Sequence, residues 1–208
     1  MSVKMDELST ALFNGTLPPP WRNLCPQTEK SLGSWMLHFE HRYQQYSSWI
    51  TDGEPKVIWL SGLHIPEAYI TALVQTTCRK NGWPLDRSTL YTEVTEFTHA
   101  SQIKDHLQSG CYVQGLYIEG AGWDYQRKCL VRLENGGGVL VQDLPILRII
   151  PIESSRLKLT NTFQTPVYTT QLRRNASGLG WVFDADLNTM DHNSHWILQG
   201  CCLLLNTD

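Results

Sequence analysis

The chain has 208 residues, a formal net charge of −3 and 18% charged residues. A protein of this length can bury a core without metal or disulfide staples, and 41% hydrophobic residues exclude a disordered segment or a coiled coil. The basic residues form pairs but no long run, which offers no electrostatic surface for nucleic acid or an anionic membrane. We therefore expect a globular domain with neither of these partners.

The cysteines indicate a reducing, cytosol-like compartment. No two are spaced as C-x-x-C, and the adjacent pair 201–202 would point to opposite faces of a strand. The N-terminus has no apolar signal region, and no stretch has the length needed to span a bilayer. The six residues are Cys25, Cys78, Cys111, Cys129, Cys201 and Cys202.

Residues 28 to about 105 carry helical signals. Apolar residues recur every three or four positions from Leu32 to Ile50, which predicts a helix with one apolar stripe. The segment 51–55, TDGEP, ends it. The short apolar run 57–60 is compatible with a strand or with a buried connector.

A second helix is expected from Pro66 to Gly82. Proline suits the first helical position and glycine suits the left-handed cap. Arg79 and Lys80 complement the dipole at the C-terminal end. Four apolar residues are expected to form the buried face: Tyr69, Ile70, Leu73 and Val74.

After Gly110 the pattern is that of β-structure. Residues 111–118 are rich in strand formers, 120–122 form a turn, and 129–133 can return as the partner strand. Further strands are expected at 144–152, 166–171, 179–187 and 195–205, separated by turn-rich segments such as 135–138 and 175–178. Strands without intervening helices predict an antiparallel barrel or sandwich. The class is therefore α+β, with a helical subdomain at 1–107 and a β-subdomain at 108–208.

The N-terminal segment 17–21, LPPPW, has two interpretations. It could be a polyproline ligand for a recognition domain. We favour a stiff connector whose Trp21 packs into its own domain.

No catalytic sequence motif is present. A phosphate-binding loop needs G-x-x-x-x-G-K-[ST], and the glycine run 136–138 lacks the following Lys and Ser or Thr, so we interpret it as a hairpin loop. The Rossmann glycine pattern and the G-x-S-x-G elbow are also missing from the sequence.

Two histidine pairs have a spacing that raises the question of metal binding. His38 and His41 flank Glu40, but a zinc protease needs histidines a full helical turn apart, so a polar helix face is the favoured interpretation. His192 and His195 follow an aspartate and have the same spacing, which a turn before the last strand explains equally well.

Two other function classes stay open on the residues alone. Glu119 and Asp124 flank a glycine turn and could face one another across a hairpin as the carboxylates of a hydrolase. Carboxylates beside glycines more commonly secure turns. Alternatively, a free-standing β-barrel could bind a sugar or peptide, with Trp123 or Trp181 as a stacking platform.

Three segments, taken together and in order, resemble the extreme C-terminal region of dynein heavy chains. Residues 59–69, WLSGLHIPEAY, and 110–124, GCYVQGLYIEGAGWD, are similar to two family motifs. The third comprises PVYTT at 166–170, Arg173-Arg174 and the ending HWILQGCCLLL at 195–205. Gly122 stands where the family commonly has Arg, and the glycine run 136–138 makes that loop unusually flexible. The resemblance runs from about Leu12 to Asp208 and favours the axonemal type.

The resemblance implies an all-helical first part and a small antiparallel β-barrel of about six strands. It implies no catalytic residue, cofactor or metal in this domain, because ATP hydrolysis and microtubule binding belong to other parts of the heavy chain. Its partners would be the AAA+ ring of the same heavy chain and the rest of the dynein complex, with microtubules contacted only indirectly. The expected location is the axoneme of a cilium or flagellum, in a reducing cytoplasmic environment.

The aromatic content suggests how such a module would act. Eight Trp and eight Tyr exceed what one core obviously needs. We expect apolar faces of the helix at 66–82 and of the barrel to dock on the ring and tune its ATPase cycle.

Overall fold

The computed structural model describes residues 3–22, 31–133, 141–158, 160–169 and 180–205. The protein divides into an N-terminal unit, Met1–Pro55, and a C-terminal unit, Lys56–Thr207. Several features named from the sequence lie outside the described residues. These are Cys25, the turn segments 135–138 and 175–178, and the pair Arg173-Arg174.

The N-terminal unit consists of three helices: α1 (Val3–Phe13), α2 (Pro19–Arg22) and α3 (Leu32–Asp52). Helix α3 begins after Ser31, whose hydroxyl accepts the Ser34 N–H, and ends before Gly53 at φ 91°. The helix predicted between Leu32 and Ile50 is thus confirmed, two residues longer than expected.

Trp21 packs inside its own unit. Its ring stacks on Trp35 with a centroid distance of 6.2 Å, and Trp35 stacks on Phe39 at 5.4 Å. Residues 19–22 form helix α2 rather than an extended polyproline segment. The connector interpretation of LPPPW therefore agrees with the structure.

Helix α4 (Pro66–Asn81) confirms the second predicted helix, with Gly82 in the left-handed conformation at its end. Its buried residues include Ile70 and Cys78. Of the four residues predicted to form the buried face, Ile70 is buried, while Tyr69, Leu73 and Val74 are half-buried. The apolar face of α4 is thus partly covered within the C-terminal unit.

The first sheet has the order β1-β3-β8-β2. Strand β1 (Val57–Trp59) runs parallel to β3 (Cys111–Gln114), and β8 (Leu147–Glu153) runs antiparallel to both β3 and β2 (Ser88–Val94). The apolar run 57–60 is therefore a strand. Strand β2 was not predicted, because residues 28–105 were interpreted as helical. Its partner β8, more than fifty residues later, supplies a seven-residue ladder that a local pattern cannot reveal.

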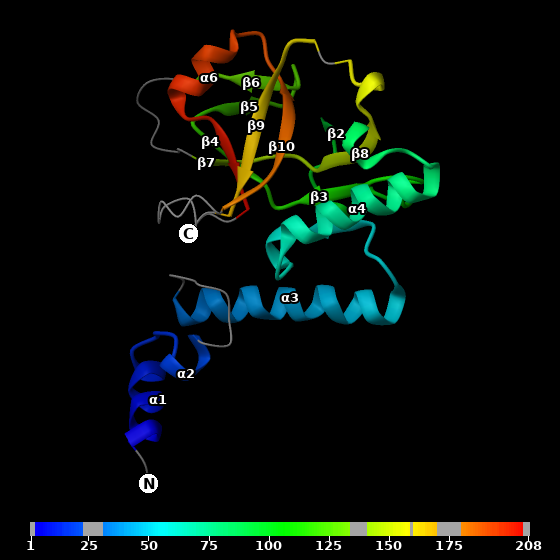
Figure 1. Ribbon diagram of the computed structural model, residues 1–208. Helices are drawn as coiled ribbons and strands as arrows, with labels where there is room; N and C mark the ends of the chain where they lie inside the picture. The colour runs from blue at the N-terminus through cyan, green and yellow to red at the C-terminus, as the bar shows by residue number, and fades with distance from the viewer. Residues whose placement is uncertain (1–2, 23–30, 134–140, 159, 170–179, 206–208) are drawn as a thin grey trace. The chain divides into compact units, whose positions relative to one another are not determined.

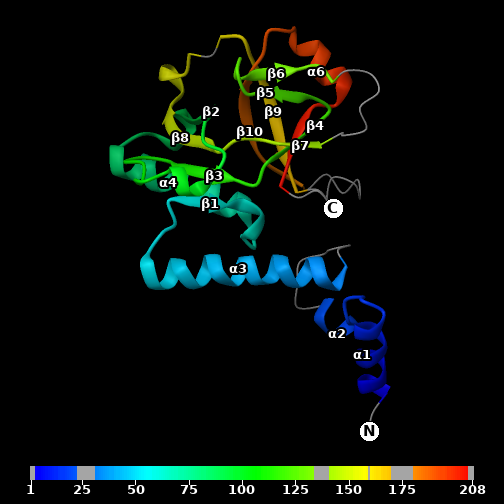
Figure 2. The same cartoon turned by 180° about the vertical axis from the view of Figure 1, so that it is seen from behind.

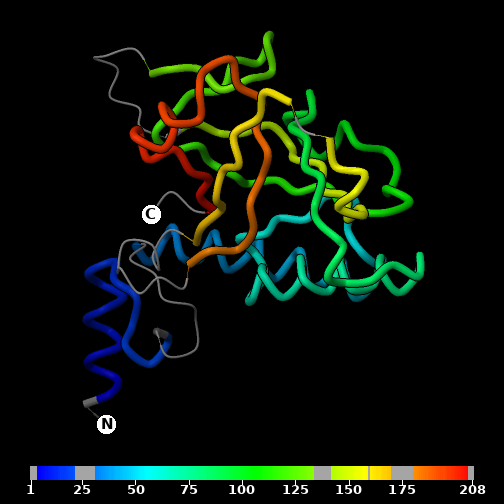
Figure 3. The backbone as a smooth tube through the Cα atoms, turned by 45° about the horizontal axis from the view of Figure 1, so that its top comes forward, coloured from blue at the N-terminus to red at the C-terminus, as the bar shows by residue number. Residues whose placement is uncertain are grey.

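The second sheet has the order β10-β9-β11-β4-β7. Figure 3 shows the antiparallel strands β9 and β10 running side by side along the unit. A separate two-stranded ladder joins β5 to β6. The bounds are β4 (Tyr117–Glu119), β5 (Gly122–Asp124), β6 (Cys129–Val131), β7 (Val141–Asp143), β9 (Thr162–Tyr168), β10 (Trp181–Asn188) and β11 (Cys202–Leu204).

The strand predicted at 111–118 is divided at Gly115. Its first part, β3, belongs to one sheet and its second part, β4, to the other. Gly115 has φ 78°, and a Cβ there would lie 2.6 Å from Cδ1 of Trp59. The backbone therefore passes from one sheet to the other at a residue that must lack a side chain. The predicted hairpin with 129–133 is wrong, since β6 pairs with β5.

The strand predicted at 195–205 is also wrong in its first half. Helix α6 (Asn193–Gln199) comes first, followed by Gly200 at φ 66° and then β11. Figures 1 and 2 both place α6 at the end of the unit that carries β5 and β6. Cys201 precedes β11 and Cys202 begins it, and both side chains are buried.

The class is α+β, as predicted, but the elements are not segregated into helices and then strands. Strands β1 and β2 precede residue 107 and pair with strands beyond it, so the first sheet crosses the predicted boundary. The all-helical first part implied by the resemblance therefore ends at Pro55. Within the described residues the strands form three separate sheets and no closed barrel, so the barrel stays a prediction.

Candidate functional site

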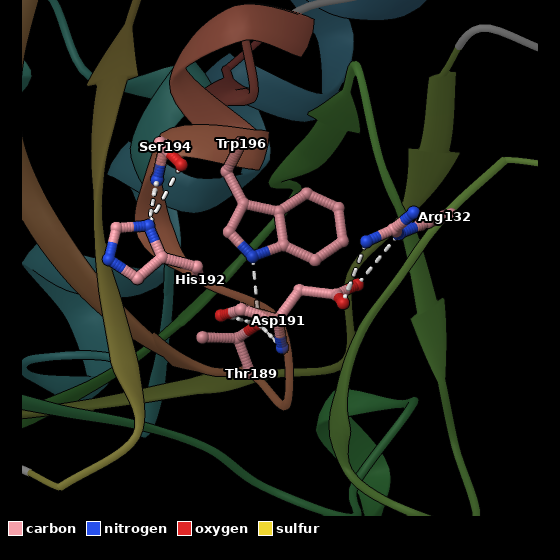
Figure 4. Close-up of polar contacts among 6 residues, drawn as sticks. All are labelled: Arg132, Thr189, Asp191, His192, Ser194 and Trp196. Carbon is pink, nitrogen blue, oxygen red and sulfur yellow. Dashed lines mark hydrogen bonds and ion pairs between the residues drawn. The ribbon is translucent and has the colours of Figure 1, made fainter.

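A buried indole anchors the closing helix (Figure 4). Trp196 on α6 is fully buried, and its Nε1 donates to Oγ1 of Thr189 at 2.7 Å. The same hydroxyl oxygen accepts the N–H of Asp191 at 3.0 Å. The Thr189 N–H donates to the carbonyl of Asn161 at 2.8 Å, which links this loop to the start of β9. Trp196 therefore has a structural role, with its single polar atom satisfied.

Asp191 and Arg132 form a two-pronged ion pair (Figure 4). Nε and Nη2 of Arg132 lie 3.0 Å and 2.9 Å from the two carboxylate oxygens. These hydrogen bonds lower the pKa of Asp191 and raise that of Arg132, and the charge of His195 adds to the first effect. The pair ties the end of β6 to the loop before α6.

His192 and His195 have different neighbours in the structure. Nδ1 of His192 caps α6 by accepting the Ser194 N–H at 3.3 Å (Figure 4), while the ring of His195 packs edge-on against Trp196 at 4.8 Å. Across the described parts of the protein, no cluster of three or more His, Cys, Asp or Glu side chains is placed to hold a metal ion.

The first histidine pair lies on helix α3. Glu40, between His38 and His41, accepts a hydrogen bond from Nε2 of Gln44 at 3.3 Å. All three residues lie at the surface or are half-buried. This arrangement agrees with the polar helix face that the spacing predicted.

Glu119 and Asp124 do not face one another across a hairpin. The register sets Glu119 opposite Cys202, whose thiol is 3.9 Å from the carboxylate, and sets Asp124 opposite Cys129 in a different ladder. Asp124 accepts the N–H groups of Gln126 and Arg127 at 2.8 Å and 2.9 Å. The bond from Arg127 is the main reason why the pKa of Asp124 is lowered. Asp124 thus secures a turn, and these hydrogen bonds favour its ionised form.

The two tryptophans predicted as alternative stacking platforms differ in exposure. Trp123 is 4% exposed and cannot receive a ligand on its face. Trp181 is 53% exposed, and its Nε1 donates to Oδ1 of Asp184 at 2.8 Å.

Helix α3 carries the apolar stripe that its sequence periodicity predicted. The side chains of this stripe are exposed in the structure. No residue of α3 is buried. Tyr43 is 66% exposed and Ile50 85% exposed. The periodicity identified the stripe, but it cannot tell whether a partner lies inside or outside these 208 residues. We define the α3 stripe as Met36, Phe39, Tyr43, Tyr46 and Ile50.

Residues 1–205 match the family model for the C-terminal domain of the dynein heavy chain. The protein is 60% identical over 208 residues to dynein axonemal heavy chain 10 of Homo sapiens, in an alignment that covers 100% of this chain and 5% of that protein. It is 58% identical over 207 residues to the dynein-1-alpha heavy chain of the flagellar inner arm I1 complex of Chlamydomonas reinhardtii, covering 100% and 4%. Identity to the dynein beta chain of the flagellar outer arm of the same alga is 33% over 207 residues, covering 99% and 4%.

The 208 residues thus span about one twentieth of the length of the curated relatives they match. In the part that the structure describes, no helix combines the length and the apolar character of a membrane span. The segments 59–69, 110–124 and 195–205 indicated the same relationship from the sequence. This protein belongs to the family of C-terminal domains of dynein heavy chains.

Proposed function

We propose that this domain is a non-catalytic module of an axonemal dynein heavy chain that packs on the AAA+ ring of the same heavy chain. The observation that carries the proposal is the match of the chain to the C-terminal domain of dynein heavy chains, in a domain that spans 5% of its human relative. Within its own unit, the α3 stripe adds apolar surface without a buried residue. Apolar surface of this kind is stabilised by removal from water.

Docking would regulate the motor through differential binding. A domain that contacts several ring modules shifts their equilibrium by as much as its affinity differs between the ring states. Intrachain interfaces of roughly 600–1,500 Å² can supply a few kcal/mol of such bias. The module therefore tunes or stabilises ATP-driven movement without binding nucleotide itself.

The docking surface that we propose differs from the one expected from sequence. Ile70 and Cys78 of α4 are buried within the C-terminal unit, so part of the apolar face of that helix is already occupied. We therefore propose the α3 stripe, rather than the apolar face of α4, as the docking surface.

The non-catalytic role is supported by the contacts of the polar side chains. Asp124 holds a turn, Asp191 pairs with Arg132 and His192 caps a helix. ATP hydrolysis and microtubule binding would belong to other parts of the heavy chain, with microtubules contacted only indirectly and neither nucleic acid nor membrane as a partner.

The proposed location is the axoneme of a cilium or flagellum, on the reducing cytoplasmic side. Its support is the kind of relative that the sequence matches, axonemal and flagellar dynein heavy chains. The five cysteines in the described residues form no disulfide and are buried, which suits a reducing compartment.

Deletion of this domain from its heavy chain tests the proposal. We expect altered microtubule-stimulated ATPase activity and altered gliding velocity, both restored at least in part when the 208-residue domain is added in trans. Intact heavy chain purified in the same way is the control. Unchanged ATPase, velocity and force after deletion would contradict the regulatory role.

A further inference from the structure

We draw no further inference here: the strongest candidate, the surface patch on the edge strand β10 where the exposed indole of Trp181 lies beside the carboxylate of Asp184, carries none, because nothing in the structure shows what covers it.

Discussion

The hydroxyl of Thr92 on β2 accepts a hydrogen bond from the backbone N–H of Asp186 on β10 at 2.6 Å, across 94 positions of sequence. These two strands belong to different sheets. Thr92 is 3% exposed, so the bond lies in the interior. The side chain of Thr92 thus satisfies the backbone N–H of Asp186 where the two sheets meet.

Thr92→Val should therefore destabilise the C-terminal unit. The valine fits the space but leaves the Asp186 N–H without its partner, at a cost of about 1–3 kcal/mol. Urea unfolding followed by circular dichroism measures the change. Thr92→Ser keeps the hydroxyl and should recover the loss of the hydrogen bond, so an equal loss in both variants would contradict this explanation.

The side chain of Asp186 predicts a pH-dependent stability. Burial, with a smaller effect of Asp184, raises the pKa of Asp186. Below the unfolded-state pKa of about 4, the carboxyl group is neutral in both states and does not lower the free energy of unfolding. As the pH rises through the higher pKa of the folded state, the ionised carboxylate destabilises the native state. We expect Asp186→Asn to raise the melting temperature at pH 7 relative to the unsubstituted protein.

The gain from Asp186→Asn should shrink towards zero as the pH is lowered below about 4, where both side chains are neutral. Melting curves between about pH 3 and pH 8 provide the comparison. A gain independent of pH would mean that the effect comes from packing rather than from charge.

The burial of the Trp196 indole predicts that substitution at this position lowers the stability of the C-terminal unit. Trp196→Phe leaves a void and removes the donor to Thr189, and we expect a loss of about 2–4 kcal/mol in the free energy of unfolding. Leu198→Ala on the same helix is the control, because Leu198 is 85% exposed and its truncation should change stability by less than about 0.5 kcal/mol. Equal losses in the two variants would contradict an anchoring role for Trp196.

Gly115→Ala should destabilise the change of sheet between β3 and β4. The new Cβ would clash with Trp59, and alanine would have to adopt the unfavourable φ of 78°. We expect the free energy of unfolding to fall by about 2–5 kcal/mol. Gly82→Ala is the matched control, since Gly82 has φ 69° with nothing within 4 Å and adds the backbone strain without a clash.

Chemical denaturation of both glycine variants separates the clash from the strain. Adding Trp59→Leu to Gly115→Ala should recover part of the loss. A purely additive double-mutant cycle would show that the ring and the new methyl group do not meet.

The ion pair of Arg132 and Asp191 predicts the opposite pH dependence from Asp186. Arg132 lowers the pKa of Asp191, so the stabilisation is present above the unfolded pKa of about 4 and is lost as the pH falls through the lower folded value. Arg132→Gln should lower the melting temperature at pH 7 and have no effect in strong acid. A deficit that persists at low pH would point to lost packing of the arginine stem.

The sequence was sufficient wherever the signal is local. Helix α4 was predicted within one residue because Pro66 and Gly82 mark its ends through their own backbone preferences. Helix α3 followed from its periodicity, and family membership followed from ordered motifs. The strand predictions for two glycine-containing segments were wrong in part, because distant strands decide their structure. Segment 111–118 is divided at Gly115, and segment 195–205 begins as a helix.

Only the tertiary structure decided the roles that depend on partners far away in sequence. Strand β2 exists because β8 pairs with it, and Glu119 and Asp124 are separated because their strands join different ladders. Periodicity identifies an apolar face but not what covers it. The faces of α3 and α4 have similar spacing, yet α4 has buried residues such as Ile70 and α3 has none. Burial results from long-range contacts, and these are not encoded in any single segment.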